Sequence, residues 1–195
     1  MINWKRAALV GGTLGLVMGL IINQARGEYS LVPEYEPRVH VPEDEVQEIY
    51  CLAEAIYFES GNQPFVGKMA VGEVIMNRVY HVGYPNTICE VVHQGPVRES
   101  WKTKQNPDLS AKDRIYYPRK WKCQFTYYCD GKSDEITESE TWEESLSAAH
   151  LMFDGRVTVV EGATHYHAVY VSPQWANHLR EVVQIQDHVF INDRS

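Results

Sequence analysis

Apolar positions recur with a helical period between residues 43 and 80, on both sides of a short turn. In the first half they fall three and four residues apart and form one face of a helix: Ile49, Leu52, Ala53 and Ile56. This helix is expected to begin after Pro42, where three acidic residues favour the positive end of the helix dipole. Gly61 and Pro64 predict its end, and the broadly apolar residues 66–80 predict a second, buried helix.

Glu59 lies in the last turn of the first predicted helix, at the edge of its apolar face. With Ile49 at zero on a helical wheel, Glu59 falls near about −80°, whereas Glu54 falls near about +140°, on the solvent side. The negative end of the helix dipole and apolar neighbours both raise the pKa of a carboxyl group in the position of Glu59. A carboxyl group tuned in this way suits a general acid, although an ordinary exposed Glu near a helix end fits the same pattern.

The rest of the chain predicts one further long helix and a small amount of β-structure. Residues 141–153 have the apolar spacing of an amphipathic helix, and residues 87–92 fit a single helical turn. Short strands are expected at residues 157–160, within 162–171, and at 182–191.

Glu73 interrupts the apolar stripe of the second predicted helix. A carboxylate there is expected to be paired, with Arg78 as one partner within reach, or to point into a cleft near Glu59 as a second carboxylate. Asn77 and Arg78 are expected to cap or brace the end of this helix.

Three motifs in order resemble the spore cortex-lytic enzymes, the SleB/CwlJ-type cell wall hydrolases. They are Glu59-Ser60-Gly61 followed by Pro64, Gly67 and Asn77-Arg78; the run CQFTYYCDGKSD at 123–134; and GATHYHAVYVSPQWA at 162–176. The resemblance covers roughly residues 48–191. Many members of the family have Ala-Arg-Gly-Glu after the Glu, where this chain has Ser-Gly-Asn-Gln.

The resemblance implies an enzyme with an α+β, mostly helical, lysozyme-like domain that cuts peptidoglycan at the β-1,4 bond between N-acetylmuramic acid and N-acetylglucosamine. Glu59 is then the expected catalytic residue. Because no second carboxylate has a clear catalytic context, a lytic transglycosylase is favoured; a hydrolytic muramidase or glucosaminidase using Glu73 is the alternative. The expected substrate-binding residues are Ser60, Gln124, Tyr128, His165, Tyr166 and His167.

Two other classes of function stay open. His165 and His167, two residues apart, would share one face of a strand, as in a metal-dependent amidase. No third ligand has clear spacing, so we expect no metal and no cofactor, with both histidines lining or bracing the cleft. A non-catalytic wall-binding module is the other alternative.

The N-terminus differs from the rest of the chain. Lys5 and Arg6 precede an uncharged apolar run of 16 residues, 7–22, and residues 25–27 fit a cleavage site. We expect a signal peptide or signal anchor at 1–27, a Pro-punctuated linker at 28–44 and the catalytic domain at 45–195. The segment would bring the domain to the membrane and place it outside, in the periplasm or anchored to the inner membrane and facing the wall, in a bacterial or a phage-encoded protein.

Charge and cysteine content fit an exported protein. Residues 1–27 hold three basic and no acidic residues, which leaves 15 basic against 26 acidic residues beyond them, a net charge of −11. Nucleic acid is therefore not expected as a partner. Residues 102–122 mix basic and aromatic side chains, which we interpret as the rim of a glycan groove. The four cysteines, at 51, 89, 123 and 129, predict two disulfides, with three possible pairings.

Overall fold

A computed structural model describes residues 41–193 of the 195-residue chain. The predicted signal segment, and the linker up to residue 40, lie outside the described residues. No helix among residues 41–193 is long and apolar enough to cross a membrane.

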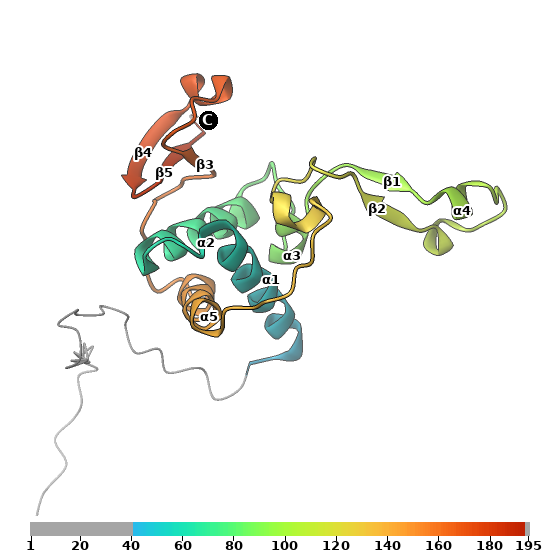
Figure 1. Cartoon of the computed structure of the whole chain (residues 1–195), viewed down its shortest axis with the longest axis horizontal. Coiled ribbons are helices and arrows are strands. Elements are labelled where there is room, and N and C mark those ends of the chain that lie inside the picture. The colour runs from blue at the N-terminus through green and yellow to red at the C-terminus, as the bar shows by residue number, and fades with distance from the viewer. Residues whose placement is uncertain (1–40, 194–195) are drawn as a thin grey trace, which may run out of the picture. The chain divides into compact units, whose positions relative to one another are not determined.

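Three helices form the core of the domain (Figure 1). They are α1 (Glu43–Ser60), α2 (Phe65–Tyr80) and α5 (Ser139–Phe153), which agree with the three predicted helices to within about two residues. They pack closely because Gly72 of α2 faces both neighbours: a Cβ atom there would lie 2.9 Å from Ile56 Cδ1 and 3.0 Å from Met152 Cγ. An ion pair between the buried Lys68 and the partly exposed Glu144, Nζ to Oε2 at 2.5 Å, also joins α2 to α5.

The short α3 (Ile88–Val92) is attached to α1 and begins where the sequence predicts a helical turn. The side chain of Thr87 caps it by accepting a hydrogen bond from the Glu90 N–H. A disulfide joins Cys51 of α1 to Cys89 of α3, and a second one joins Cys123 to Cys129. The prediction of two disulfides is confirmed.

The C-terminal part forms a three-stranded antiparallel sheet in the order β3-β5-β4. Its strands are β3 (His165–Ala168), β4 (Arg180–Ile185) and β5 (His188–Asn192), and the 3₁₀ helix η3 (Gln174–His178) lies between β3 and β4. The single strand predicted at 182–191 is wrong, because the chain turns at Gln186, which has φ +47°, and forms a hairpin. The strand predicted at 157–160 is also wrong: that segment is a loop.

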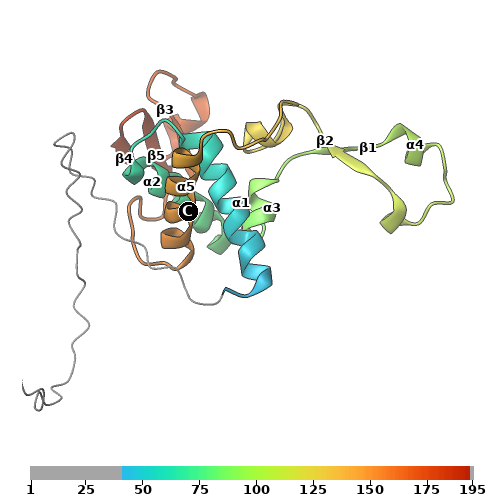
Figure 2. The same ribbon diagram turned by 60° about the horizontal axis from the view of Figure 1, so that its bottom comes forward.

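A second, two-stranded sheet lies between α3 and η2, where the sequence analysis expects no strand. Strands β1 (Val97–Glu99) and β2 (Tyr116–Pro118) pair with each other, and between them lie the one-turn α4 (Trp101–Lys104) and the 3₁₀ helix η1 (Ala111–Asp113). Figures 1 and 2 both show this hairpin extending away from the helices. The chain returns to the helices through the 3₁₀ helix η2 (Thr126–Cys129).

Candidate active site

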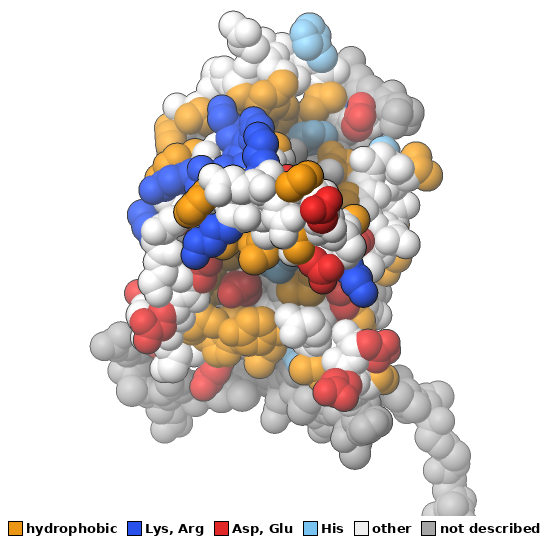
Figure 3. Space-filling model, turned by 90° about the vertical axis from the view of Figure 1, so that its right-hand side faces the viewer, with side chains coloured by type: hydrophobic (Ala, Val, Ile, Leu, Met, Phe, Trp, Pro, Cys, Tyr) orange, Lys and Arg blue, Asp and Glu red, His pale blue; other side chains and the backbone are white. Residues whose placement is uncertain are grey.

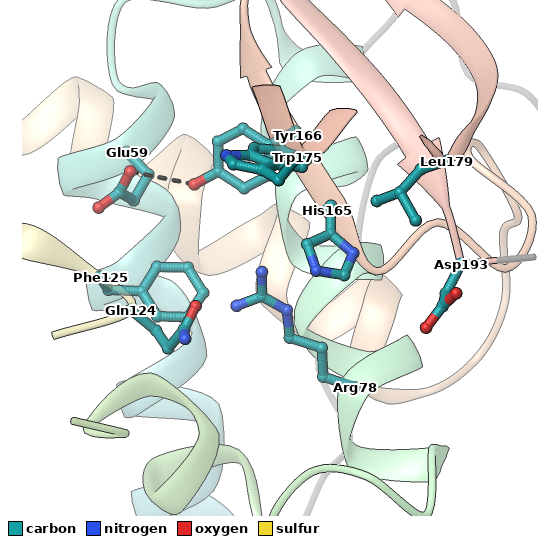
Figure 4. A pocket seen from close by; sticks show the side chains of 9 residues that line it. All are labelled: Glu59, Arg78, Gln124, Phe125, His165, Tyr166, Trp175, Leu179 and Asp193. Atoms are coloured by element: carbon teal, nitrogen blue, oxygen red, sulfur yellow. Dashed lines mark hydrogen bonds between the residues drawn. The ribbon is translucent and has the colours of Figure 1, made fainter. Parts of the chain in front are cut away.

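A cavity of about 570 Å³ lies where the helices, the loop before η2 and the C-terminal sheet meet (Figure 4). We call it the Glu59 cavity. Its polar and charged lining residues are Glu59, Arg78, Gln124, His165 and Asp193. Its aromatic and aliphatic lining residues are Phe125, Tyr166, Trp175 and Leu179.

Glu59 projects into the cavity from the last turn of α1, as the sequence predicts. The Tyr166 hydroxyl donates a hydrogen bond of 3.0 Å to Glu59 Oε2. Burial raises the pKa of the Glu59 carboxyl, while the Tyr166 hydrogen bond and the Arg78 charge lower it, and burial prevails. The site therefore favours a Glu59 that keeps its proton to higher pH than an ordinary Glu.

Tyr166 lies at the edge of the same cavity on β3. Burial and the neighbouring charge of Glu59 raise the pKa of its phenol well above the ordinary value, so Tyr166 stays a hydrogen-bond donor. His165, the preceding residue of β3, lines the same cavity, and its Nδ1 lies 3.0 Å from Thr164 Oγ1. Burial, and secondarily the charge of Arg78, lower the pKa of His165, which favours a neutral imidazole.

Arg78 is a functional candidate for which the sequence predicts only structural roles, bracing the end of its helix or pairing with Glu73. Arg78 does brace the end of α2, because its Nε donates to the Thr164 carbonyl at 2.7 Å. The neighbouring Asn77 Nδ2 donates to the Ala163 carbonyl at 2.9 Å. These two hydrogen bonds attach the end of α2 to the segment that leads into β3. Its guanidinium also reaches the cavity, 5.3 Å from the Phe125 ring centroid. Only 6% of Arg78 is exposed, and its Nη1 has no hydrogen-bond partner among residues 41–193.

The disulfide loop 123–129 contributes Gln124 and Phe125 to the cavity wall. Gln124 is exposed at the rim, as expected for a group that contacts substrate. Phe125 is 1% exposed, so it serves as core and as cavity wall at once.

Glu73 does not line the Glu59 cavity. The residue is 8% exposed, and its carboxylate accepts hydrogen bonds from the backbone N–H groups of Val159 and Val160. The predicted pairing with Arg78 is therefore wrong, and Glu73 instead holds the loop after α5. The second carboxylate of the cavity is Asp193, directly after β5, which Figure 4 shows beyond Arg78 and His165 from Glu59.

Three other predicted substrate-binding residues lie outside the lining of the cavity. Ser60 is fully buried and donates to the Ile56 carbonyl at 2.8 Å. Tyr128 stacks on His93, with ring centroids 4.1 Å apart. His167 lines a neighbouring, smaller depression, and its Nδ1 lies 2.9 Å from Ala168 O. The cavity thus brings together Glu59, Gln124, His165 and Tyr166 from the predicted set.

Within the part of the chain that the structure describes, no group of three His, Cys, Asp or Glu side chains is arranged to hold a metal ion. His165 and His167 both face Trp175, with ring centroids 5.5 and 6.0 Å away, which agrees with their predicted common face.

Comparison with known families identifies the chain through its central and C-terminal parts. The model of the Cell Wall Hydrolase family matches residues 62–191, about two thirds of the sequence. The chain belongs to the Cell Wall Hydrolase family. The predicted enzyme class and the resemblance to SleB-type proteins are confirmed. The match begins at residue 62, just beyond Glu59.

Two relatives from curated proteins share short segments with this chain. A spore cortex-lytic enzyme of Bacillus cereus is 40% identical over 47 residues, 24% of this chain and 18% of the relative. A spore cortex-lytic enzyme of Oceanobacillus iheyensis is 36% identical over 59 residues, 30% of this chain and 21% of the relative. The matched segments span about a fifth of the length of these relatives.

Two solved structures have a similar fold. The catalytic domain of the Bacillus cereus SleB protein matches with a TM-score of 0.52 and 22% identity, covering 81% of this chain and 100% of that domain. The catalytic domain of the germination-specific lytic transglycosylase SleB from Bacillus anthracis matches with a TM-score of 0.50 and 22% identity, covering 80% and 100%. These likenesses confirm the α+β, mostly helical fold class.

Proposed function

We propose that this cell wall hydrolase cleaves the β-1,4 bond between N-acetylmuramic acid and N-acetylglucosamine in peptidoglycan, as a lytic transglycosylase with Glu59 as acid and base. The observation that carries the proposal is the Glu59 carboxyl itself. Its pKa is raised by burial, and it accepts a hydrogen bond from Tyr166 at the wall of an open cavity. A carboxyl group kept protonated beside a substrate cleft is the group that glycosidic bond cleavage requires.

The reaction then proceeds in two steps at one carboxyl group. Glu59 gives its proton to the glycosidic oxygen as the bond from that oxygen to the muramoyl anomeric carbon breaks, and positive charge develops on the sugar ring. The resulting carboxylate, held by the Tyr166 hydroxyl, takes the proton of the muramoyl 6-hydroxyl. The 6-oxygen bonds to the anomeric carbon, which closes a 1,6-anhydro ring and consumes no water.

Arg78 supports substrate binding in this proposal. A buried donor without a partner costs about 1–3 kcal/mol, and a substrate oxygen placed at Arg78 Nη1 would remove that cost. The acetamido carbonyl of a sugar in the cavity is a suitable acceptor. Gln124 at the rim and the half-exposed indole of Trp175 offer an amide and an aromatic face to neighbouring sugars.

Two disulfides in the domain support a place of work outside the cytoplasm, where such bonds persist. The proposed signal peptide or anchor at residues 1–27 would bring the chain there, to the periplasm or the face of the membrane toward the wall.

Mass spectrometry of the soluble fragments released from isolated peptidoglycan tests the proposal. The purified chain is expected to release fragments ending in 1,6-anhydro-muramic acid. Fragments heavier by one water, with reducing ends, would contradict the transglycosylase mechanism while keeping the substrate. No soluble fragments at all would contradict enzymatic cleavage and favour a wall-binding module.

Hydrolysis is the second candidate because a second carboxylate, Asp193, lines the same cavity. A hydrolase would use it to activate water or to stabilise the charged sugar. If the products carry reducing ends, Asp193→Asn is expected to reduce their release, whereas a transglycosylase should tolerate this change.

Replacing Tyr166 with Phe is expected to move the pH dependence of cleavage. The lost hydroxyl no longer stabilises the ionised carboxylate, so the pKa of Glu59 rises further above its ordinary value. Activity that requires protonated Glu59 falls as pH rises through this pKa, so the alkaline limb of the pH–rate profile should shift to higher pH.

Tyr50→Phe is the matched control for this prediction. Tyr50 lies on the same helix as Glu59, packs against Trp142 with ring centroids 5.2 Å apart and does not line the Glu59 cavity, so the alkaline limb should stay in place. An unshifted limb in Tyr166→Phe would show that the hydrogen bond does not set the working pKa.

A further inference from the structure

The β1–β2 hairpin carries a concentration of positive charge that the Glu59 cavity does not use. We define the basic arm as residues 97–122. It holds eight of the 18 Lys and Arg residues of the chain and three acidic residues, a net charge of +5, whereas all other residues together carry −13. Figure 3 faces this side of the domain and shows most of the visible Lys and Arg side chains on one half of this face, beside hydrophobic ones.

Little of this charge is neutralised within the arm. Arg114 pairs with Glu99 at 2.7 Å, and Asp113 accepts a hydrogen bond from Ser110. Among residues 41–193, the other seven cations of the arm form no ion pair: Arg98, Lys102, Lys104, Lys112, Arg119, Lys120 and Lys122. Seven cations on one exposed projection therefore remain available to an anionic partner.

Aromatic side chains are exposed along the same arm. The exposed fraction is 65% for Trp101, 51% for Tyr116, 50% for Tyr117 and 55% for Trp121. Trp121 has φ +60°, a conformation rare for a bulky residue, and its N–H donates to the Cys129 carbonyl at 3.1 Å. The backbone thus holds this indole outward, with Lys120 Nζ 5.5 Å from its ring centroid. Flat apolar faces beside cations suit sugar rings that carry anionic groups.

The base of the arm is joined directly to the rim of the Glu59 cavity. Its two ends are held together by hydrogen bonds from Arg119 N to Pro96 O and from Gln124 N to Gln94 O, each of 2.9 Å. Gln124 and Phe125, which line the cavity, follow Lys122 after a single residue, Cys123. A polymer that leaves the cavity past Gln124 therefore meets the arm next.

We propose that the basic arm is a second substrate-binding surface, which holds the carboxylate-bearing stem peptides and the sugars of the peptidoglycan strand beyond the bond that is cut. This inference rests on the proposed function. Peptidoglycan is a polymer whose stem peptides carry free carboxylates, so its charge complements the arm. The acidic remainder of the domain would repel such a strand, so the arm also selects the direction in which the strand leaves the cavity.

The continuity of the arm with the cavity favours peptidoglycan over other anionic polymers. Single-stranded nucleic acid and anionic lipid headgroups would also contact cations and aromatic rings. Neither explains why the arm begins at the rim of the cavity, and a chain of net charge −8 is a poor nucleic-acid binder.

The test measures binding of the full chain in a Glu59→Gln background to isolated, insoluble peptidoglycan by sedimentation. The arm variant is Arg119→Gln/Lys120→Gln/Lys122→Gln, and its matched control, Arg119→Lys/Lys120→Arg/Lys122→Arg, keeps every charge. All three positions are exposed, so the fold should survive both sets of changes. Each protein is also tested on peptidoglycan whose carboxylates have been converted to neutral amides with carbodiimide and ethanolamine.

The arm variant is expected to bind native peptidoglycan about tenfold more weakly, because three exposed charge contacts are lost. The charge-keeping control should bind like the unmodified arm. On amidated peptidoglycan the unmodified arm should lose at least this factor, and the arm variant, which keeps four of the seven unpaired cations, should lose less than the unmodified arm. The comparison of native with amidated peptidoglycan, made with the unmodified arm, needs no substitution in the arm. Its outcome therefore does not depend on whether the arm variant folds.

Equal binding of the arm variant and the unmodified arm to native peptidoglycan would overturn the inference. The inference would also fail if the arm variant lost binding to phosphatidylglycerol vesicles or to single-stranded DNA but kept its binding to peptidoglycan. The proposed function fails separately: the chain with Glu59 intact would then release no soluble fragments, whatever the arm binds.

Discussion

Glu59→Gln is expected to reduce the release of soluble fragments from peptidoglycan by about a hundred- to ten-thousand-fold, the range typical of losing a general acid. The amide keeps the size of the side chain and can still accept the Tyr166 hydrogen bond, but it cannot give up a proton to the glycosidic oxygen. The measurement is the initial rate of fragment release, with circular dichroism confirming the fold.

Glu54→Gln is the control on the same helix. Sequence placed Glu54 on the solvent side; the structure makes it partly buried, and burial followed by the charge of Asp134 raises the pKa of its carboxyl too. It does not line the Glu59 cavity, so its replacement should leave cleavage nearly unchanged. If both variants cut as fast as the wild type, the acid lies elsewhere.

Thermal unfolding of Glu59→Gln gives a second, independent readout. A carboxyl group whose folded-state pKa is raised stabilises the fold below its unfolded pKa of about 4.3, and that contribution is lost as pH rises through the folded-state pKa. The amide does not ionise, so the variant should melt at a higher temperature than the wild type near about pH 7. The two should converge in acid, where Glu59 is neutral in both states. Equal melting temperatures of the variant and the wild type across this pH range would mean that burial does not destabilise the ionised form of Glu59.

The local part of the site was predictable from sequence because it depends on one helix. The period of Ile49, Leu52 and Ile56 fixes the face on which Glu59 lies, and Gly61 fixes its distance from the helix end. The pKa direction follows from those two facts, and the structure agrees with it. The same reasoning placed both histidines of β3 on one face, since alternation along a strand is also local.

The remainder of the site depends on contacts between distant segments. Arg78 reaches the cavity because α2 is attached to Thr164, 86 residues away in the chain, and no periodic pattern contains that information. Glu73 found its partners in the amides of Val159 and Val160, so a carboxylate on an apolar stripe was correctly expected to be paired but with the wrong group. The β4–β5 turn at Gln186 was missed because it has none of the Gly or Pro signals that mark most hairpins.

The two disulfides are expected to matter for different properties, the Cys51–Cys89 bond mainly for stability and the Cys123–Cys129 bond mainly for activity. The Cys51–Cys89 bond closes a loop with a sequence separation of 38, and the Cys123–Cys129 bond one of 6. In the chain-entropy account, losing the first costs about 4 kcal/mol of unfolding free energy and losing the second about 2 kcal/mol. Cys51→Ala/Cys89→Ala should therefore lower the melting temperature more, by about 8–16 °C for a domain of this size.

The rate of peptidoglycan cleavage should depend instead on the Cys123–Cys129 bond. Cys123 and Cys129 bracket Gln124 and Phe125 on the cavity wall, whereas Cys51 and Cys89 lie in α1 and α3 and contribute nothing to that wall. Cys123→Ala/Cys129→Ala should slow cleavage about ten- to a hundredfold at temperatures where it remains folded, because the cavity wall is no longer held in place. Cys51→Ala/Cys89→Ala should keep its rate below its lowered melting temperature. If both variants slow cleavage equally while folded, the loop at 123–129 is not what shapes the site. The Trp121 N–H donates to the Cys129 carbonyl, so losing the Cys123–Cys129 bond should also weaken the binding of peptidoglycan to the basic arm. One variant would then affect both the cavity and the arm.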